Sequence, residues 1–480
     1  MSMASKNTIS IATIFILGLI WRVVIVRTYS FDGLYGQDPY AYFNFAQSLN
    51  EYLSFSKPLP PFFWPWGYPL ILLLGKFLGT PEISINILLG SLIPSLIFLT
   101  CLELKLSLAA AVIGGIVTAI SGQILFSSLA IMSDIPGMFW ILMSCLCLIK
   151  GLNTSNYSHI LIAGLFLAIA GITRWISLIL LIPWGVAVFG RYRNLGSIFR
   201  LILPIIILTS LQLWFSSNSK FDALDHHFLG NWSLKNFWAA ELTGLEGVVS
   251  TKFPNLIFYS KALSDPFFIH PFFVLLVGLG LLGIFQNSQR SHVILLIGWG
   301  LSTYLFLSGL PVQNPRYCLQ VFPIIAILTA FGFDYFKQRL KITSFIDLIL
   351  IVGIIGVSVI SIKANTRQVL QLIEIYNSDK LVANWISKAV TPKTPVYAFG
   401  ITLTLQHYHP ELTTKDIYFE SIESLSTELN KDVYFVVDID NIKSQWKDSR
   451  LGETLNWLKN REGFKLIGKN GKYSLFKING

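Results

Sequence analysis

The sequence predicts a polytopic α-helical membrane protein with about eleven transmembrane helices and a small α/β domain at its C-terminal end. Composition is the first reason, because 53% of the 480 residues are hydrophobic and only 13% are charged, against about 25% charged residues in soluble proteins. Recurring apolar runs up to residue 362 are the second reason. The third is the change to a water-soluble composition after that residue.

A helix needs roughly 20 apolar residues to cross the hydrocarbon core of a bilayer. By this length the chain contains about eleven predicted spans, at residues 8–27, 82–103, 107–126, 136–150, 159–173, 175–190, 199–215, 267–285, 292–310, 317–333 and 343–362. The apolar stretch 68–78 is too short to cross and is interrupted by Pro69, Gly75 and Lys76. We therefore predict that it forms a helix at the membrane interface.

Basic residues are concentrated in alternate loops between the predicted spans. With the N-terminus inside, the inner loops contain Lys105, Lys150, Arg191, Arg193, Arg200, Arg290, Lys337, Arg339 and Lys341. This is the positive-inside pattern, and an odd number of spans then places the C-terminus outside. The net charge of +10 does not indicate nucleic-acid binding, because the basic residues form no continuous patch.

Two domains follow from this layout. The transmembrane domain comprises residues 1–362 and includes long outer loops at 30–81 and 216–266. Residues 363–480 form the predicted extracytoplasmic domain, with helices at 381–390 and 451–460 and strands at 396–399, 433–437 and 472–478. Strands that alternate with helices favour a small α/β domain. The four cysteines lie in or beside apolar segments, so they are interpreted as small hydrophobic residues without disulfides.

Ionisable residues at the outer membrane boundary are the candidates for function, since such groups are costly in an apolar protein. Asp38 precedes Pro39 and Asp134 precedes the fourth span. Both positions also suit a helix N-cap. Arg174 and Arg316 precede the sixth and tenth spans, where snorkelling is the simpler explanation. Lys57 completes the set.

Together these residues point to one outward-facing cleft. An arginine binds phosphate oxygens with its planar fork, and a carboxylate can deprotonate an attacking hydroxyl. The aromatic loop 62–69 is suited to the membrane interface. A lipid-linked phosphosugar fits all three features.

The order of these motifs resembles the GT-C superfamily of glycosyltransferases, nearest to its ArnT, RgtA-like and protein O-mannosyltransferase branches. The resemblance rests on Asp38 in the first outer loop, Gly67-Tyr68-Pro69, Ser133-Asp134-Ile135-Pro136, and Arg316-Tyr317 before a span that contains Pro323. Asp38-Pro39 replaces the Asp-Glu pair of many relatives and is more similar to the Asp-Pro of oligosaccharyltransferase-like members. The branch is therefore left open.

The resemblance implies an inverting transfer of a sugar from a polyprenyl-phosphate donor to a hydroxyl of a lipid, glycan or protein. It implies that Asp38 is the catalytic residue and that Arg316 holds the donor phosphate with help from Lys57. The further substrate-binding candidates are Asp134, Arg174, Tyr40, Tyr68 and Tyr317.

A divalent cation is an alternative to the arginine clamp, although no cofactor is required by the sequence. Asp38, Asp134, Asp225 and His226 are its candidate ligands. Asp225-His226-His227 suggests zinc, but the side chains of two adjacent histidines usually point apart.

Three rival functions remain at this stage. They are a lipid-linked sugar transporter or flippase, a ligase that uses a lipid-diphosphate donor, and a non-catalytic membrane scaffold. Transporters place ionisable groups near the midplane, whereas these spans are nearly free of charge apart from Arg22. Short inner loops and modest size favour a bacterial inner membrane.

Overall fold

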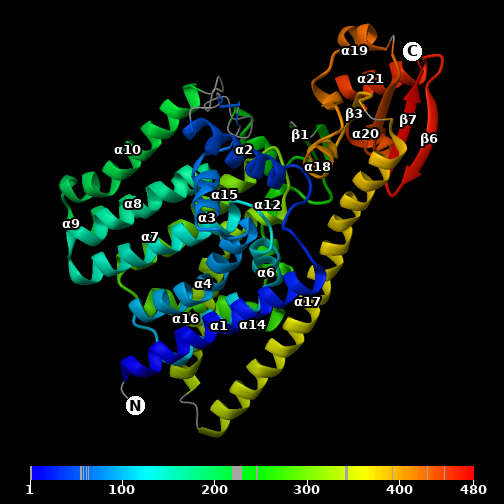
Figure 1. The fold of residues 1–480 in the computed structure, drawn as a ribbon. Helices are drawn as coiled ribbons and strands as arrows, with labels where there is room; N and C mark the ends of the chain where they lie inside the picture. Colours follow the sequence, from blue (N-terminus) through cyan, green and yellow to red (C-terminus); the bar gives the residue numbers. More distant parts are fainter. Residues whose placement is uncertain are drawn as a thin grey trace. The chain divides into compact units, whose positions relative to one another are not determined.

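The computed structural model describes residues 3–54, 57, 59–60, 62, 64–218, 230–244, 247–340, 344–391, 393–429, 431–447 and 449–479 (Figure 1). The chain forms two compact units. The helical unit contains Met1–Asp32, Phe45–Ala239 and Phe253–Leu370. The C-terminal unit contains Gly33–Asn44, Ala240–Lys252 and Gln371–Gly480, so it includes a segment from each long loop as well as most of the tail.

Each stretch predicted as a span is helical. The α-helices in these stretches are α1 (Met3–Tyr29), α4 (Glu82–Glu103), α5 (Leu108–Ala119), α6 (Gly122–Ser128), α7 (Asp134–Thr154), α8 (Tyr157–Thr173), α9 (Leu181–Tyr192), α10 (Leu195–Asn218), α14 (Pro271–Asn287), α15 (Arg290–Ser308), α16 (Phe322–Leu340) and α17 (Ser344–Ala389). Among the described residues, seven helices are long and apolar enough to cross a membrane, or eight if α5 and α6, bent by 60°, form one span. The protein is thus a multi-pass membrane protein, and the number eleven stays a prediction.

Shorter helices connect these spans. They are α2 (Asp38–Leu53), α3 (Gly67–Phe77), η1 (Trp175–Leu180), η2 (Leu234–Phe237), α12 (Asn255–Phe258), α13 (Lys261–Ser264) and η3 (Pro315–Gln320). Helix α3 coincides with the stretch predicted as an interfacial helix. Its first residue, Gly67, allows a close approach, since a Cβ there would lie 2.6 Å from the Ile172 carbonyl oxygen of α8.

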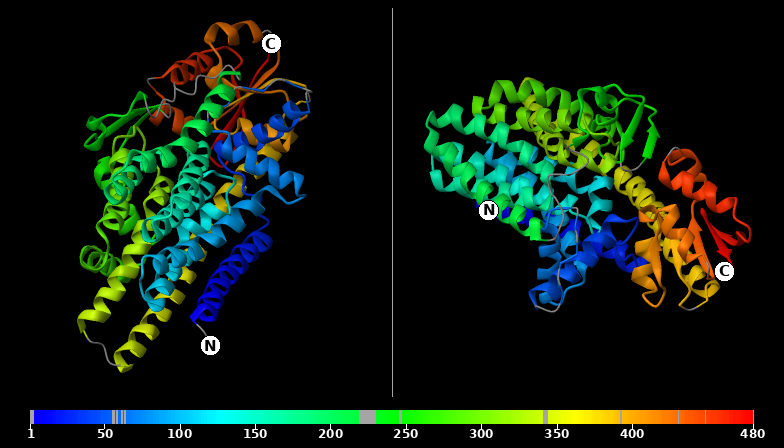
Figure 2. Two further views of the ribbon diagram at one scale, coloured as in Figure 1. Left: turned by 90° about the vertical axis from the view of Figure 1, so that its left-hand side faces the viewer. Right: turned by 90° about the horizontal axis from the view of Figure 1, so that it is seen from above.

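The helical unit is held together by close helix pairs. Figures 1 and 2 show α7, α8 and α10 side by side, and α14 against α16. At the α14–α16 crossing, a Cβ on Gly280 would lie 1.9 Å from the Leu328 carbonyl oxygen, and one on Gly332 would lie 1.8 Å from that of Leu276. Small residues let membrane helices approach to backbone contact, which is a main source of packing energy where the hydrophobic effect is absent.

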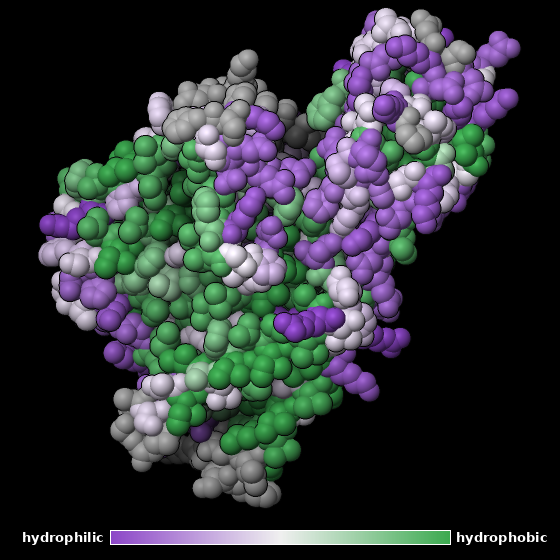
Figure 3. Space-filling view, in the orientation of Figure 1, coloured by the Kyte–Doolittle hydropathy of each residue, from purple (hydrophilic) through white to green (hydrophobic). Residues whose placement is uncertain are grey.

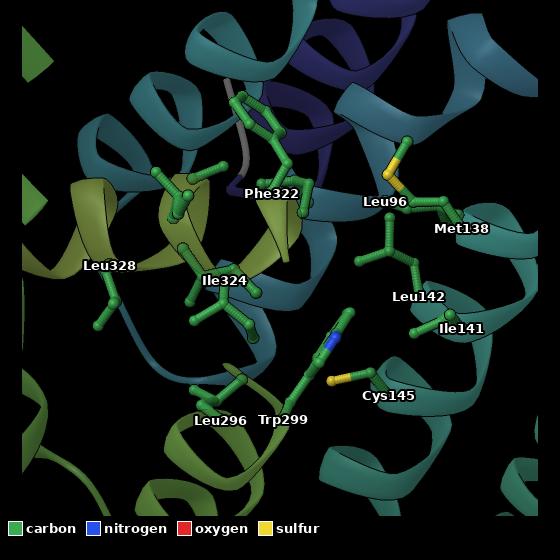
Figure 4. Close-up of a cluster of buried hydrophobic side chains, with 14 of the residues drawn as sticks. Leu96, Met138, Ile141, Leu142, Cys145, Leu296, Trp299, Phe322, Ile324 and Leu328 are labelled. Atoms are coloured by element: carbon green, nitrogen blue, oxygen red, sulfur yellow. The ribbon is translucent and has the colours of Figure 1, made fainter. Parts of the chain in front are cut away.

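A buried apolar cluster joins these helices (Figure 4). Trp299 of α15 lies between α7 and the start of α16 in this cluster, and its ring meets the ring of Trp184 edge-on at 5.5 Å. Many large hydrophobic side chains are instead exposed on α1, α10 and α17, including Leu17 at 62% and Ile360 at 61%. Hydrophobic residues cover much of the visible face of the helical unit (Figure 3), as contact with lipid requires.

The C-terminal unit contains a five-stranded sheet with the order β4 (Thr414–Asp416), β3 (Val396–Ala398), β5 (Val433–Val437), β7 (Tyr473–Ile478) and β6 (Lys465–Asn470). Strands β3, β4 and β5 are parallel, and β7 is antiparallel to both β5 and β6. Helices α18 (Thr402–Tyr408), η4 (Ile417–Phe419), α19 (Ile422–Glu428), α20 (Ile439–Gln445) and α21 (Arg450–Lys459) connect the strands. Apolar clusters cover both faces of the sheet.

Besides strands β4 and β6, which were not predicted, two features of the C-terminal unit differ from the sequence prediction. The last predicted span and the helix at 381–390 belong to one helix, α17, which Figures 1 and 2 show without a break. Residues 363–380 between them contain neither proline nor glycine, so nothing ends the helix there. The second difference is a hairpin within the loop at 216–266, formed by β1 (Glu241–Gly244) and β2 (Gly247–Ser250).

Candidate functional site

A buried ion pair lies at the start of α7. Arg174 Nη1 is 2.7 Å from Asp134 Oδ1, and the two side chains are only 13% and 3% exposed. Asp134 is the first residue of α7 and Ser133 is the N-cap, so the cap interpretation of Asp134 is wrong by one residue. The carboxylate also benefits from the positive end of the α7 dipole. Two of the residues predicted to share a site are therefore in direct contact.

The backbone at Arg174 explains how its side chain reaches α7. Helix α8 ends at Thr173, and Arg174 is extended, with φ −156° and ψ 110°, before η1 begins at Trp175. On α7, Gly137 lies beside this side chain, since a Cβ there would be 3.4 Å from Arg174 Cβ. This break between two helices turns an arginine at the edge of a span into a buried side chain.

The second arginine, Arg316, lies in η3, beside Tyr317. The sequence Asn-Pro-Arg starts this helix, because Asn314 accepts a hydrogen bond from the Arg316 amide and Pro315 takes the first position. The guanidinium carbons of Arg174 and Arg316 lie 5.1 Å and 5.5 Å from the centroid of the Tyr317 ring. Both distances suit a cation–π contact. The structure thus brings Asp134, Arg174, Arg316 and Tyr317 together.

Asn86 of α4 belongs to this site but was not predicted. It is fully buried, and its amide donates to the carbonyl oxygens of Ala130 and Met132 at 2.5 Å and 2.8 Å. Its own oxygen accepts from the hydroxyl of Tyr68 at 3.1 Å. Asn86 thereby fixes the turn that precedes Asp134, and Tyr68 supports it. A lone asparagine within an apolar span was the available signal, since such polar residues are rarely neutral in function.

Gln320 is the second residue that sequence reasoning missed. It ends η3, is 2% exposed, and neither its amide nitrogen nor its amide oxygen has a hydrogen-bond partner among the described residues. A Cβ on Gly137 would be 4.0 Å from its Nε2, so Gln320 lies beside the same glycine as Arg174. Its backbone oxygen accepts from Trp299 Nε1 at 2.9 Å, which ties η3 to α15.

The ion pair also retains unused hydrogen-bonding capacity. Asp134 Oδ1 and Arg174 Nε make no aligned hydrogen bond within the described part of the chain, although Oδ1 is in ion-pair contact with Nη1. Buried polar atoms are normally satisfied, and each one that is not costs about 1–3 kcal/mol. Such a group of atoms, from three chain segments, is typical of a site that a polar ligand completes.

Asp38 and Tyr40 lie in the C-terminal unit rather than in the helical unit. Helix α2 begins at Asp38 itself, and the Gln37 carbonyl accepts the first helical hydrogen bond from Ala41. Pro39 is thus the second helical residue, one position later than the cap interpretation expects. Tyr40 is buried against the tail domain, with its ring 5.5 Å from that of His407.

The other predicted residues lie elsewhere. Lys57 is exposed and forms a 3.2 Å salt bridge with Glu51. Asp225 and His226, named as candidate metal ligands, lie outside the described residues. Within the described residues, no group of three or more His, Cys, Asp or Glu side chains is arranged to hold a metal ion.

Comparison with known proteins gives one family match and several structural neighbours. Residues 83–248 match the family described as dolichyl-phosphate-mannose-protein mannosyltransferase, a region that contains Asp134 and Arg174 but ends before Arg316. A search of curated proteins by sequence finds no match.

Two solved structures show the fold. ArnT from Cupriavidus metallidurans, bound to undecaprenyl phosphate, is 12% identical with a TM-score of 0.59, over 97% of this chain and 98% of that one. The oligosaccharyltransferase AglB from Archaeoglobus fulgidus, in complex with an inhibitory peptide and a dolichol-phosphate, is 12% identical with a TM-score of 0.63, over 98% of this chain and 74% of that one. The chain thus has the fold of the GT-C membrane glycosyltransferases, as the order of its motifs predicts.

Proposed function

We propose that the protein is an inverting glycosyltransferase that moves a sugar from a polyprenyl-phosphate donor to an acceptor hydroxyl at the outer face of a bacterial inner membrane. The acceptor is a lipid, glycan or protein. The observation that carries the proposal is the group formed by Asp134, Arg174 and Arg316 around Tyr317. ArnT, which shares the fold, was solved with undecaprenyl phosphate.

The two arginines suit the phosphate of such a donor. A guanidinium binds two phosphate oxygens at once, and two of them beside one carboxylate leave the group with net positive charge. The atoms of Arg174 and Gln320 without hydrogen-bond partners would gain them from the ligand. Lys57 is a further candidate contact, since its exposed salt bridge with Glu51 is worth at most about 1 kcal/mol and is easily exchanged.

The proposed reaction needs one base and a stabilised leaving group. The acceptor oxygen attacks the anomeric carbon, the bond from that carbon to the phosphate oxygen breaks, and the configuration inverts. Asp38 takes the proton of the attacking hydroxyl. The polyprenyl phosphate leaves as an anion whose charge Arg316 and Arg174 stabilise.

The test is turnover of defined donors by the full-length protein in nanodiscs. Polyprenyl-phosphate sugars, beginning with the mannose donor, are supplied with membrane extracts as acceptor, and free polyprenyl phosphate is measured by mass spectrometry. We expect Asp38→Asn to lower kcat roughly 100- to 10,000-fold, the usual contribution of a general base. Arg316→Ala should raise KM for the donor at least about 10-fold, since a charge-assisted hydrogen bond contributes about 1.5–3 kcal/mol.

Lys337→Ala is the matched control for Arg316→Ala, because Lys337 lies in the last turn of α16, the helix that follows η3. It should leave turnover unchanged. If wild type releases no more polyprenyl phosphate than nanodiscs without protein, the transferase proposal is wrong and a flippase or scaffold is favoured. Equal release by wild type and Asp38→Asn would contradict the catalytic role of Asp38. Turnover of a polyprenyl-diphosphate-linked sugar, supplied in place of the monophosphate donors, with release of polyprenyl diphosphate would indicate the ligase alternative.

A further inference from the structure

The segment that carries Asp38 is held by the tail domain through aromatic contacts. Tyr35 stacks on Tyr376 of α17, with ring centroids 4.1 Å apart and planes at 27°. The ring of His407, in α18, contacts two aromatic rings. Its centroid is 5.5 Å from that of Tyr40 and 5.0 Å from that of Phe43, which it meets edge-on. All five residues belong to the C-terminal unit, so this packing is internal to one compact unit.

Tyr408 extends this set of aromatic contacts. Its ring meets that of Tyr40 edge-on at 6.2 Å, while Lys380 Nζ lies 4.6 Å from the Tyr408 ring centroid on the tail side. Aromatic pairs of this geometry stabilise a contact beyond the effect of the area that they bury. Several such pairs can therefore fix one short segment.

A polar contact sets the position of the segment along its length. Gln37 Nε2 donates to the Gly400 carbonyl oxygen at 2.9 Å, and Tyr473 donates to the same oxygen at 3.1 Å. Gly400 follows β3 and has a φ of +78°, a conformation that suits glycine. Gln37 directly precedes Asp38, so this hydrogen bond fixes the backbone at the proposed catalytic residue.

Gly400 also lies just beyond the carboxyl end of strand β3 in the parallel part of the sheet. After β3 the chain turns to β4 on one side, and after β5 it continues through α20 and α21 to β6 on the other. The carboxyl ends of β3 and β5 are therefore a topological switch point, which is where parallel α/β sheets bind their ligands. In this chain that position receives Gln37.

We propose that the tail domain is a positioning element of the transferase, with His407 as the residue through which it orients the start of α2 and hence Asp38. This rests on the proposed role of Asp38. The segment needs such support because Gly33 and Gly36, with φ values of +85° and +60°, give it a flexible approach. A displacement of about 1 Å in a reacting group can lower the rate roughly 100-fold.

The test compares His407→Ala, His407→Phe and Tyr418→Ala in the full-length protein. Tyr418 packs against Phe419 and Trp446 in the same domain, so it controls for general loss of domain stability. Hydrogen exchange of residues 33–44 and the kinetics of donor turnover are measured for each variant. We expect His407→Ala to speed exchange in this segment and to lower kcat about 10- to 100-fold, with KM for the donor within about 3-fold of wild type.

His407→Phe keeps the edge contacts and should restore most of the rate, whereas Tyr418→Ala should leave exchange at 33–44 as in wild type. The inference is overturned if His407→Ala leaves both exchange and kcat unchanged while Asp38→Asn is inactive. If Asp38→Asn retains full turnover, the proposed catalytic role of Asp38 fails instead, and the exchange result still decides whether His407 holds the segment.

Discussion

At the scale of single residues, the ion pair between Asp134 and Arg174 is better explained by function than by stability. Replacing a buried ion pair by well-packed apolar residues is often neutral or stabilising, because removing two charges from water costs about as much as their attraction returns. Here the pair also leaves Asp134 Oδ1 and Arg174 Nε without aligned hydrogen bonds among the described residues. A phosphate bound as proposed above would accept a hydrogen bond from Arg174 Nε, and a hydroxyl of the attached sugar could donate to Asp134 Oδ1.

Gln320 gives the sharpest test at this scale. Gln320→Leu removes two buried polar atoms that lack partners within the described residues and keeps a similar volume, so we expect the free energy of unfolding to rise by about 1–3 kcal/mol. The same change should lower donor turnover, since stability and function oppose each other at such sites. Thermal unfolding of the detergent-solubilised protein and donor turnover are the two measurements. A variant that is less stable than wild type would contradict the ligand interpretation.

At the scale of elements, the helices of the membrane part were predictable and the contacts between them were not. Apolar length identified residues 82–103, and α4 has the same bounds. Strand β5 was found because five apolar residues follow one another, as expected of a strand buried on both faces. Strand β4 was missed because Thr-Lys-Asp has no apolar pattern. Strand β6 was missed because its two large apolar residues, Leu466 and Ile467, are adjacent and exposed, so the strand shows neither an alternating nor a continuous apolar pattern.

The α14–α16 crossing yields a prediction with a control on the same helix. Gly280→Ala would place a methyl group 1.9 Å from the Leu328 carbonyl oxygen, whereas a Cβ on Gly278 meets nothing within 4 Å. We expect Gly280→Ala to destabilise the protein by about 1–3 kcal/mol, the usual cost of overpacking, and Gly278→Ala to have little effect. Melting temperatures in detergent compare the two. Equal melting temperatures would show that the helices do not touch at Gly280.

Asp416 gives the C-terminal sheet a predictable pH dependence. Burial raises the pKa of this carboxyl above the ordinary value of 3.8, despite hydrogen bonds from Tyr418 and Thr402. The native state therefore holds its proton more tightly than the unfolded chain, and the stability that Asp416 contributes is full below the ordinary pKa and lost as pH rises through the native value. The amide of Asp416→Asn does not titrate, so this variant does not lose stability at this position as pH rises.

We accordingly expect the melting temperature of Asp416→Asn, relative to wild type, to be higher at pH 7.5 than at pH 4. The amide keeps one oxygen for the Tyr418 N–H, and its nitrogen can donate to the Thr402 hydroxyl. Asp440→Asn, an exposed change on α20, is the control at both pH values. A difference between variant and wild type that does not change with pH would contradict the burial of a charged group at this position.

At the scale of the whole molecule, the structure groups the predicted site residues differently from the sequence prediction. The sequence analysis predicted that ionisable residues at the outer membrane boundary line one cleft, among them Asp38, Asp134, Arg174 and Arg316. The structure brings the last three together in the helical unit and places Asp38 with the tail domain. Sequence could not show this, because the stacking of Tyr35 on Tyr376 joins positions more than 300 residues apart and leaves no local pattern.

This division predicts that donor binding and transfer chemistry can be separated by mutation. A ligand that binds only the folded state raises stability by RT ln(1 + [L]/Kd), about 2.7 kcal/mol at 100 times Kd. Polyprenyl phosphate should therefore raise the melting temperature of wild type and Asp38→Asn equally. The arginines that contact Tyr317 should contribute more than Asp38 to the binding of polyprenyl phosphate. Arg316→Ala and Arg174→Ala should therefore lose most of this increase in melting temperature.

Polyprenol without phosphate is the control ligand, and these arginines should give it no stabilising effect on wild type or on any variant. A full shift in Arg316→Ala, together with a lost shift in Asp38→Asn, would reverse the roles assigned to the two units.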